Sequence, residues 1–461
     1  MPPRASLKTF LATARAALTA QSSKRATPLT FVVGNESADL DSLCSALLLA
    51  YFNTYAPPKR RASIGEGSLA SNTLHIPVCH LLRADLALRP EFTAVLRDAG
   101  VKGEDVFTLE DVLPHENGVS QSDNTEDSTH RPSSGTTTKG MNPEDTHWLL
   151  VDHNAMTGSL ANTFASRVTG CVDHHADENT IPRDAQPRVI EKSGSCASLV
   201  LEHCAEIWEA LSPDETTDGN RNTSGNDEDD AKKVDAQIAR LALAPILIDT
   251  INLGDKNKTT EHDERAVALA EGKIAAAVEG GGGEKYDREA FFKRLAELKE
   301  DIADMSFRDV FRKDYKEWSV AGLDLGTSSV PRGFGYLVDE KAKGDKGVFV
   351  KALVDWGKEK DVLDLEDKMD VVMLLTAFQD ENEVFHRELL VWGRSEMGVR
   401  AAKLFEEKYA GELRLESWGD GALDEDGEGE WRRCWMQGAV QHSRKQIAPL
   451  LRDVLKEVAG R

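Results

Sequence analysis

The sequence predicts an α/β fold whose first domain contains a parallel sheet with helices on both faces. Leu29–Val33 is an apolar run rich in β-branched residues, and it is followed by a polar loop and then a segment with helical apolar spacing up to Tyr51. Two further apolar runs, 148–151 and 168–172, are each followed at once by Asp and His. Such runs are typical of buried parallel strands, in which ligands bind beyond the carboxyl ends.

The length of 461 residues favours two domains over one. Segments 235–251 and 263–278 are helical in composition, and the run of glycines that begins at Gly280 is typical of a linker. We expect a first domain over residues 1–275, a glycine-rich linker over 276–290 and a second α/β domain over 291–461, with a cleft between the two domains.

Three acidic or polar segments interrupt this pattern. Segments 115–145 and 213–235 have too few apolar residues to offset the entropy lost on ordering, so we expect both to be disordered insertions. Segment 416–430 is predicted to be an acidic loop of the second domain.

The composition excludes several classes of partner and compartment. A formal net charge of −23 argues against broad binding to nucleic acids or anionic membranes, and no apolar run is long enough to cross a bilayer. The cysteines are scattered without a CxxC pair, so we expect buried thiols in a reducing compartment. The N-terminal segment is predicted to be a helix packed on the first domain, in a cytoplasmic protein. A mitochondrial presequence is the alternative.

Metal-ligating side chains follow each of the three predicted strands. Asp39 and Asp41 come after the first strand, Asp152 and His153 after the second, and residues 173–175 (DHH) after the third. Carboxylates and imidazoles that converge at one sheet edge suit a pair of Mn²⁺ or Mg²⁺ ions. For a single residue, a helix cap or a buried structural histidine is the simpler interpretation. Their repetition after successive strands favours the metal site.

The order of short motifs along the chain is more specific than any one of them. These motifs are GNESADLDS (34–42), VDHN (151–154), VDHH (172–175), GSCASLV (194–200), LIDTINL (247–253), DYK (314–316) and SRKQ (443–446). The series resembles the signatures of the DHH phosphoesterase superfamily in its DHHA2 branch. That branch contains family II inorganic pyrophosphatases, prune proteins and fungal cytosolic exopolyphosphatases.

This resemblance implies a set of metal ligands and a catalytic group. It implies that two divalent ions, Mn²⁺ or Mg²⁺, are held by Asp39, Asp41, Asp152, His174 and Asp249. Spacing alone would allow Asp249 to be a helix cap. The resemblance also implies that His175 acts with Asp152 in catalysis, where His175 binds a leaving phosphate oxygen or assists proton transfer. His153 is expected to be an accessory residue that orients a neighbouring ligand.

Asn35 departs from the pyrophosphatase pattern, which has histidine at this position. We expect Asn35 to be an accessory residue whose amide oxygen shifts the metal preference from Mn²⁺ toward Mg²⁺. The fungal exopolyphosphatases are similar to this chain at the same motif. The resemblance therefore favours polyphosphate over pyrophosphate as the substrate.

The second domain is expected to supply positive charge to the substrate. Arg444 and Lys445 precede a predicted helix, at whose N-terminus phosphate binds well, and Lys316 is the third residue that the resemblance implies. A further set of residues could extend a basic track for longer chains or could be solvated surface; these are His386, Arg387, Arg394 and Arg400.

Together these features predict an exopolyphosphatase with its active site in the cleft between the domains. It would release orthophosphate from the ends of inorganic polyphosphate, without nucleic-acid or membrane partners. The sequence leaves the oligomeric state open and is compatible with a monomer. Two alternatives stay open: an enzyme for pyrophosphate or another short phosphoanhydride or nucleotide, and a prune-like scaffold without catalytic activity. A DHH nuclease is disfavoured by the acidic surface.

Overall fold

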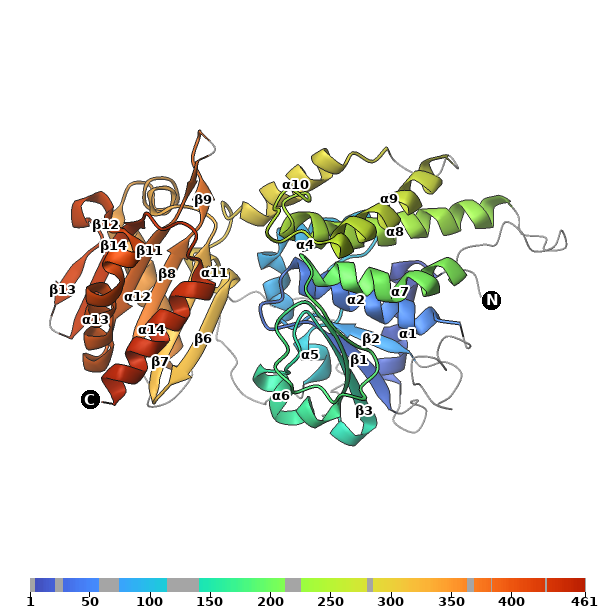
Figure 1. The fold of residues 1–461 in the computed structure, drawn as a ribbon, viewed down its shortest axis with the longest axis horizontal. Helices are drawn as coiled ribbons and strands as arrows, with labels where there is room; N and C mark the ends of the chain where they lie inside the picture. Colours follow the sequence, from blue (N-terminus) through green and yellow to red (C-terminus); the bar gives the residue numbers. More distant parts are fainter. Residues whose placement is uncertain are drawn as a thin grey trace, which may run out of the picture. The chain divides into compact units, whose positions relative to one another are not determined.

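The structure is a computed structural model that describes residues 5–20, 28–57, 74–113, 141–211, 225–279, 285–362, 369–382, 384–427 and 429–460. The chain forms two compact units, Met1–Lys299 (unit 1) and Glu300–Arg461 (unit 2), and both are drawn in Figure 1. Most of the two sequence segments expected to be disordered, residues 114–140 and 212–224, lies outside the described residues.

Unit 1 contains a five-stranded parallel sheet with the order β2-β1-β3-β4-β5. Its strands are β1 (Leu29–Val33), β2 (His75–Val78), β3 (Thr146–Val151), β4 (Val168–Asp173) and β5 (Arg188–Ile190). β1 pairs with β3 and β3 with β4, all in parallel, so their carboxyl ends finish at one edge of the sheet. The predicted parallel sheet is confirmed, with the expected motifs directly beyond that edge.

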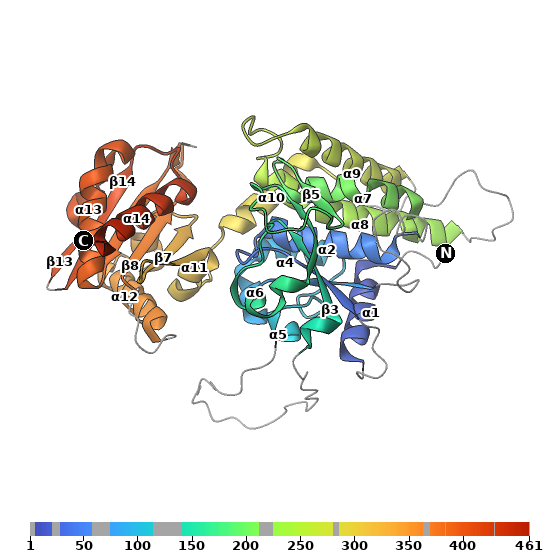
Figure 2. The ribbon, with the colours of Figure 1, turned by 60° about the horizontal axis from the view of Figure 1, so that its bottom comes forward.

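Helices cover both faces of this sheet, as predicted (Figures 1 and 2). On one face, Trp148 of β3 lies between Phe31 of β1 and Phe164 of α6, with ring centroids 4.8 Å apart in both pairs. On the other face α2 packs with α7, where the rings of Phe52 and Trp208 are 5.2 Å apart. The helices of unit 1 are α1 (Leu7–Thr19), α2 (Leu40–Tyr55), α4 (Pro90–Asp98), α5 (Leu109–Val112), α6 (Gly158–Phe164), α7 (Cys196–Leu211), α8 (Gly225–Asp249), α9 (Glu261–Glu279) and α10 (Arg288–Glu300), with 3₁₀ turns at Arg83–Leu88, Pro143–Asp145 and Ala165–Arg167.

The N-terminal helix α1 packs on unit 1, as predicted. Ser6 caps it by accepting a hydrogen bond from the backbone N–H of Thr9. Its buried face includes Phe10, whose ring meets Tyr51 of α2 edge to face, and the Tyr51 hydroxyl donates to the carbonyl of Ala5. The apolar face of α1 is therefore part of the hydrophobic core of unit 1.

Two boundaries of unit 1 differ from the expected ones. The segment 213–235 was expected to be disordered, but α8 begins at Gly225, and Asp235 is buried and accepts a hydrogen bond from the indole N–H of Trp208. The second domain was expected to begin at residue 291, but Phe291 and Leu295 of α10 are buried in the core of unit 1. The compact unit therefore ends at Lys299, because the apolar face of α10 needs that core.

Unit 2 is built on a mixed sheet with the order β12-β14-β11-β8-β7-β6, to which β13 adds at β14. The strands are β6 (Tyr315–Val320), β7 (Leu323–Val330), β8 (Val371–Thr376), β11 (Glu388–Gly393), β12 (Leu415–Ser417), β13 (Glu425–Gly427) and β14 (Glu430–Gln437), and β9 (Phe378–Gln379) pairs with β10 (Phe385–His386). The helices are α11 (Phe307–Lys313), α12 (Lys346–Val362), α13 (Glu396–Leu413) and α14 (Arg444–Ala459), with a π-helix at Tyr336–Lys341 and a 3₁₀ turn at Trp418–Gly421. The predicted α/β character of the second domain is confirmed.

The acidic segment 416–430 is not the loop that its composition predicts. It contains β13 and part of β12, and both strands pair with β14. Leu423 is buried, and the indole N–H of Trp418 donates to the carboxylate of Glu388 at 2.9 Å. A few apolar anchors suffice to order an acidic segment when a neighbouring strand pairs with its backbone.

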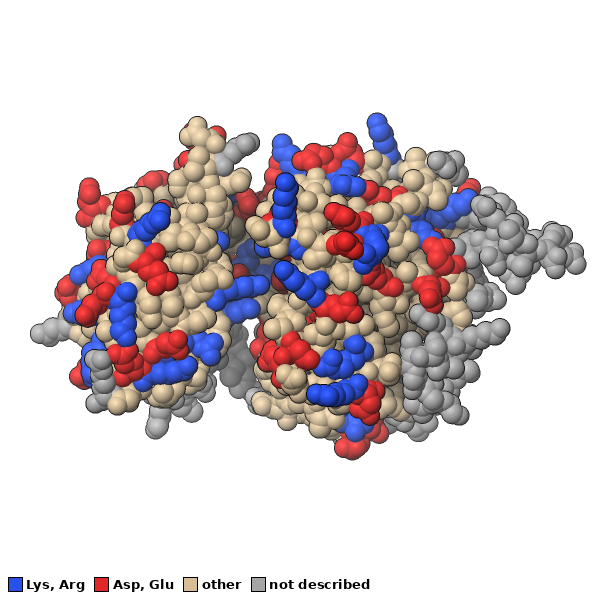
Figure 3. All heavy atoms as spheres, in the orientation of Figure 1, with Lys and Arg blue, Asp and Glu red and all other residues tan. Residues whose placement is uncertain are grey.

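Other bulk predictions can be compared with the surface and the core. Acidic and basic side chains are mixed over the visible face of each unit (Figure 3). Each of the six cysteines is a buried free thiol, as predicted. Among the described residues, we find no helix with the length and apolarity needed to span a bilayer.

Candidate metal centre

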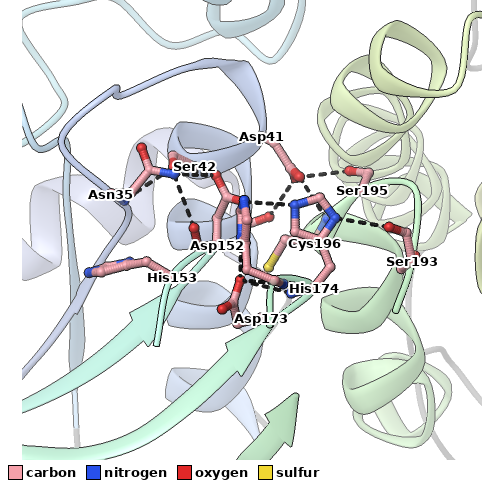
Figure 4. Close-up of polar contacts among 12 residues, drawn as sticks. Asn35, Asp41, Ser42, Asp152, His153, Asp173, His174, Ser193, Ser195 and Cys196 are labelled. Atoms are coloured by element: carbon pink, nitrogen blue, oxygen red, sulfur yellow. Dashed lines mark hydrogen bonds and ion pairs between the residues drawn. The ribbon is translucent and has the colours of Figure 1, made fainter. Parts of the chain in front are cut away.

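Asp152 lies at the centre of the site, directly after β3. Its φ of 61° is rare for a residue other than glycine and turns the chain sharply at the sheet edge. One carboxylate oxygen, Oδ2, accepts hydrogen bonds from the Ser42 hydroxyl at 2.6 Å and the Asn35 amide at 2.8 Å. The other, Oδ1, lies 3.1 Å from Nε2 of His174 (Figure 4). Burial and then repulsion from Asp39 and Asp41 raise the pKa of Asp152 well above its usual range.

His174 is oriented by its other ring nitrogen. Nδ1 donates to the backbone carbonyl of Ser193 at 3.0 Å, which turns Nε2 toward Asp152. Metal-bound histidines usually make this kind of bond through the nitrogen that does not bind the metal. Burial opposes a charge on the ring, but the hydrogen bond with Asp152 and the attraction of Asp41 raise the pKa of His174 to about 10.

His175 is held by Asp173, the first residue of the DHH triplet. Oδ1 of Asp173 accepts from Nδ1 of His175 at 2.8 Å, and Oδ2 accepts from the Asn154 amide at 2.6 Å. The His175 ring meets His174 edge to face, and 45% of its side chain is exposed. Ligand atoms of Asp152, His174 and His175 all lie within 4.8 Å of one another. The structure thus brings these three predicted residues together and leaves His175 open to solvent.

Asp41 belongs to the first turn of α2 and reaches the start of α7. Its Oδ2 accepts the backbone N–H of Cys196 at 2.6 Å, and its Oδ1 accepts the N–H of Ala197 and the hydroxyl of Ser195, both at 2.9 Å. A helix N-terminus stabilises a carboxylate in this way. Oδ1 also accepts from Ser45, whereas Oδ2 has one bond to the protein and keeps a lone pair for a cation.

Asp39 and Asp249 are the other two predicted carboxylate ligands. Asp39 caps α2 by accepting the N–H of Ser42, and its side chain is exposed. Asp249 is the last residue of α8. Burial, and next repulsion from Asp41, raise the pKa of Asp249 well above its usual range, although Lys299 lowers it. Because Asp39 and Asp152 repel Asp249 as well, all four carboxylates share one electrostatic environment.

The two accessory residues differ from expectation. The Asn35 amide donates to both the carbonyl and Oδ2 of Asp152, while its oxygen accepts the N–H of Ser37. Asn35 therefore positions Asp152 with its nitrogen, and its oxygen is used within its own loop. His153 donates through Nδ1 to the carbonyl of Val151, its Nε2 is a buried atom without a hydrogen-bond partner among the described residues, and its ring points away from Asp152 in Figure 4. Burial lowers the pKa of His153 to about 4.

The donor set fits a hard or borderline divalent cation. Carboxylate oxygens and one imidazole nitrogen are the ligands that Mg²⁺ and Mn²⁺ accept. Buried carboxylates that raise one another's pKa favour a proton or a cation among them. Asp152 and His174 would hold the ion together, with Asp41 and Asp249 on the side of α2 and α8.

In unit 2 one of the residues predicted to bind substrate, Arg444, contacts Asp314. The guanidinium of Arg444 donates to the backbone carbonyl and to Oδ1 of Asp314, both at 2.7 Å, and so brings the DYK and SRKQ motifs together. Ser443 caps α14 in a capping box with Gln446, which confirms that these cations lie at a helix N-terminus. Lys445 is exposed in the first turn of α14, and Lys316 is exposed on β6.

Three of the four residues suggested for a basic track make contacts within unit 2 instead. Arg394 is 4% exposed and donates to the backbone carbonyls of Gly357 and Met369, so it is a buried structural residue. His386 pairs with Asp380 at 3.0 Å. Arg387 donates to the carbonyl of Val440 at 2.7 Å and covers the ring of Phe385. These contacts explain the residues within unit 2 without a substrate.

Comparison with known families agrees with this architecture. A model described as "DHH family, N-terminal domain" matches residues 30–246, and a model described as "DHHA2 domain" matches residues 293–454. The chain contains a DHH family N-terminal domain followed by a DHHA2 domain.

Relatives of this DHH protein align with nearly its whole length. A Schizosaccharomyces pombe protein named "Putative exopolyphosphatase" is 27% identical over 96% of this chain and 95% of its own. The Bos taurus and Homo sapiens proteins named "Exopolyphosphatase PRUNE1" are each 23% identical over 97% of this chain and 79% of their own. Among solved structures, a Methanococcus jannaschii protein titled "putative family II inorganic pyrophosphatase" has 17% identity and a TM-score of 0.48, covering 93% of this chain and 99% of that one.

Several residues that build the DHH site escaped the sequence analysis. Ser42 and Ser195 each donate to the carboxylate of a predicted metal ligand. The sequence pattern groups Asp173 with the candidate metal ligands, but the structure shows it accepting hydrogen bonds from both DHH histidines. Serines in short motifs carry no periodic signal, although both lie within the quoted GNESADLDS and GSCASLV segments. Asp263, at the start of α9, lies in none of the quoted motifs and could have been found only as a helix-capping residue.

Proposed function

We propose that this DHH protein is an exopolyphosphatase that removes orthophosphate from the ends of inorganic polyphosphate in the cytoplasm. The observation that carries the proposal is the pair of buried Asp152 and half-buried His174, at the carboxyl edge of a parallel sheet and in the field of Asp39, Asp41 and Asp249. The choice of polyphosphate is supported by relatives named exopolyphosphatase that align with nearly the whole chain.

Divalent cations bound by these residues would polarise phosphoryl oxygens. They would also lower the pKa of water toward neutral pH. Hydrogen bonds already orient three of the predicted ligands. The N–H groups at the start of α7 hold Asp41, Asn35 and Ser42 hold Asp152, and the carbonyl of Ser193 holds His174. The products of one turnover are one orthophosphate and a polyphosphate shorter by one unit, with one water consumed.

His175 is proposed to serve the leaving group. Asp173 accepts its Nδ1–H, and when the ring carries a second proton, its Nε2–H can donate a hydrogen bond or that proton to the oxygen of the departing phosphate. Arg444, Lys445 and Lys316 are proposed to bind phosphates farther along the chain. Two guanidinium nitrogens of Arg444 donate to Asp314, so the side chain of Arg444 is already oriented before substrate binds.

Orthophosphate release from a ladder of substrates would test this function. Purified protein with Mg²⁺ or Mn²⁺ is given pyrophosphate, tripolyphosphate and long polyphosphate, and the products are separated by length. We expect orthophosphate and chains shortened one unit at a time, with long polyphosphate preferred over pyrophosphate. Fastest turnover of pyrophosphate would contradict the substrate choice. Failure to hydrolyse any of them with either ion would favour the scaffold alternative.

A further inference from the structure

Asp263 is fully buried at the third position of α9, and it accepts hydrogen bonds on both carboxylate oxygens. Oδ1 takes the hydroxyls of Ser193 and Ser198 and the N–H of Ser195, at 3.0, 2.7 and 3.2 Å. Oδ2 takes the N–H of Gly194 at 2.9 Å and both the N–H and the hydroxyl of Thr260 at 2.8 Å. The Thr260 contacts cap α9, whereas the others fasten residues 193–198, a loop that continues into the first turn of α7 and is called the loop of residues 193–198 below.

The loop of residues 193–198 touches two of the metal-ligand side chains. The carbonyl of Ser193 accepts Nδ1 of His174 and so aims its Nε2. At the other end of the loop, Ser195, Cys196 and Ala197 donate to the carboxylate of Asp41. The shape of this loop therefore decides where both ligands point.

The same loop packs against a third ligand-bearing segment. A Cβ added at Gly194 would lie 2.6 Å from Cγ2 of Thr250, the residue after Asp249, and 2.8 Å from Oδ2 of Asp263. Both distances are too short for any side chain, so glycine is required for this close approach. Through this loop, Asp263 connects three segments that carry predicted metal ligands: the start of α2, the end of α8 and the residues after β4.

We propose that Asp263 is a positioning residue of the metal centre, which holds the loop of residues 193–198 in the form that aims Asp41 and His174 at the cation. This inference rests on the metal site of the proposed function. Asp263 touches neither metal ligand, and it acts through the loop between them.

The geometry requires a carboxylate at this position. Each oxygen of Asp263 faces at least one backbone N–H, Ser195 on one side and Gly194 and Thr260 on the other. An asparagine amide, in either orientation, would place its own N–H against one of these donors. Although burial opposes ionisation, hydrogen bonds from Ser198, Thr260 and Gly194 lower the pKa of Asp263, so the group stays charged at neutral pH.

Asp263→Asn therefore tests the inference, with Mn²⁺ alone as the probe. The full-length protein is stripped with EDTA, and free Mn²⁺ is followed by electron paramagnetic resonance as the protein is titrated. We expect the variant to bind Mn²⁺ about 10–100-fold more weakly than the wild type, the usual cost of losing a partner of metal ligands.

Asp111→Asn is the matched control. Asp111 caps α5 through Thr108 as Asp263 caps α9 through Thr260, and it also pairs with Arg15 and Arg83. Both variants should unfold at lower temperature, but Asp111→Asn should keep the Mn²⁺ affinity of the wild type. Equal affinity of Asp263→Asn and the wild type would overturn the positioning role and leave the proposed function standing. Absence of Mn²⁺ binding to the wild type would instead overturn the metal site itself.

Ser198→Ala decides the question if Asp263→Asn does not fold. The Ser198 hydroxyl donates to Oδ1 of Asp263, and its removal leaves the other loop contacts in place. We expect Mn²⁺ affinity to fall about threefold to tenfold, toward the lower limit for such partners. An unchanged affinity in the folded Ser198→Ala protein would overturn the inference.

Discussion

Asn35 donates its side-chain amide to both the carboxylate and the backbone carbonyl of Asp152, at 2.8 and 3.0 Å. It fixes the central carboxylate of the site and offers no nitrogen lone pair to a cation. The first motif of this chain therefore contributes a hydrogen-bond donor where an imidazole would contribute a ligand.

Asn35→His should increase the preference for Mn²⁺ over Mg²⁺. A neutral imidazole nitrogen is a better ligand for Mn²⁺ than for Mg²⁺, so we expect the ratio of the two dissociation constants to shift by about tenfold. Competition between the ions on the stripped protein measures this ratio. Asn35→Ala is the control, because it removes the donor to Asp152 and should weaken both ions alike. The same ratio in Asn35→His and the wild type would contradict the prediction.

Asp249→Asn should change protein stability in opposite directions with and without metal. The pKa of Asp249 is raised, so its contribution to stability is present below the unfolded value near 3.8 and is lost as the pH rises through the folded value. In EDTA at pH 8 the variant should unfold at a higher temperature than the wild type, by about 2–4 °C for each kcal/mol recovered.

Saturating Mn²⁺ should reverse the order of the two melting temperatures, because the variant has lost a ligand. The advantage of the variant in EDTA should also shrink as the pH falls through the raised pKa of Asp249, because the wild-type carboxyl then takes up a proton. Thermal unfolding at several pH values checks both effects. A variant that is less stable than the wild type under every condition would show that Asp249 has only a structural role.

Binding of Mn²⁺ should release protons at pH 7. The pKa of His174 is about 10 before a cation binds, because its hydrogen bond with Asp152 and the attraction of Asp41 outweigh burial. A cation must displace that proton, so at least about one proton should leave per chain. Calorimetric titration in two buffers with different ionisation enthalpies counts the protons. Equal binding enthalpies in the two buffers would contradict this picture.

Arg444→Gln should weaken polyphosphate binding and leave metal binding intact. Arg444 belongs to unit 2 and is oriented by Asp314, whereas the metal ligands belong to unit 1. Loss of a charged hydrogen bond, worth about 1.5–3 kcal/mol, should raise KM about 10–100-fold. Arg433→Gln makes the same charge change at a residue paired with Asp424 and Asp426, and it should leave KM unchanged. A normal KM for Arg444→Gln would remove Arg444 from the substrate site.

The sheet and most of the candidate site could be predicted because the same pattern, an apolar run followed by metal-ligating residues, repeats along the sequence. Asp152 and the DHH triplet each follow an apolar run at the same place in successive strand–loop units, so topology alone brings them to one edge. Asp263 has no such repetition. It lies in a capping pattern that occurs at many helix starts, and only the folded loop of residues 193–198 reveals its role.

The errors arose where composition conflicted with tertiary contacts. The many acidic residues between 416 and 430 predicted a loop, although Trp418 and Leu423 anchor this segment. The polar residues at the start of α8 predicted disorder, although Asp235 accepts a hydrogen bond from Trp208. The side-chain orientation of Asn35 could not be read from its residue type, because an amide can present either its oxygen or its nitrogen.

Orthophosphate release from long polyphosphate by the EDTA-stripped protein, as Mn²⁺ or Mg²⁺ is added back, tests the account most directly. We expect no turnover without the ion, full turnover after its return, and a loss of about a thousandfold or more in Asp152→Ala, equivalent to about 4 kcal/mol of transition-state stabilisation. Asp177→Ala, which removes a surface partner of Arg188, should behave as the wild type. Turnover without any divalent ion, or full activity in Asp152→Ala, would contradict a metal centre built on Asp152.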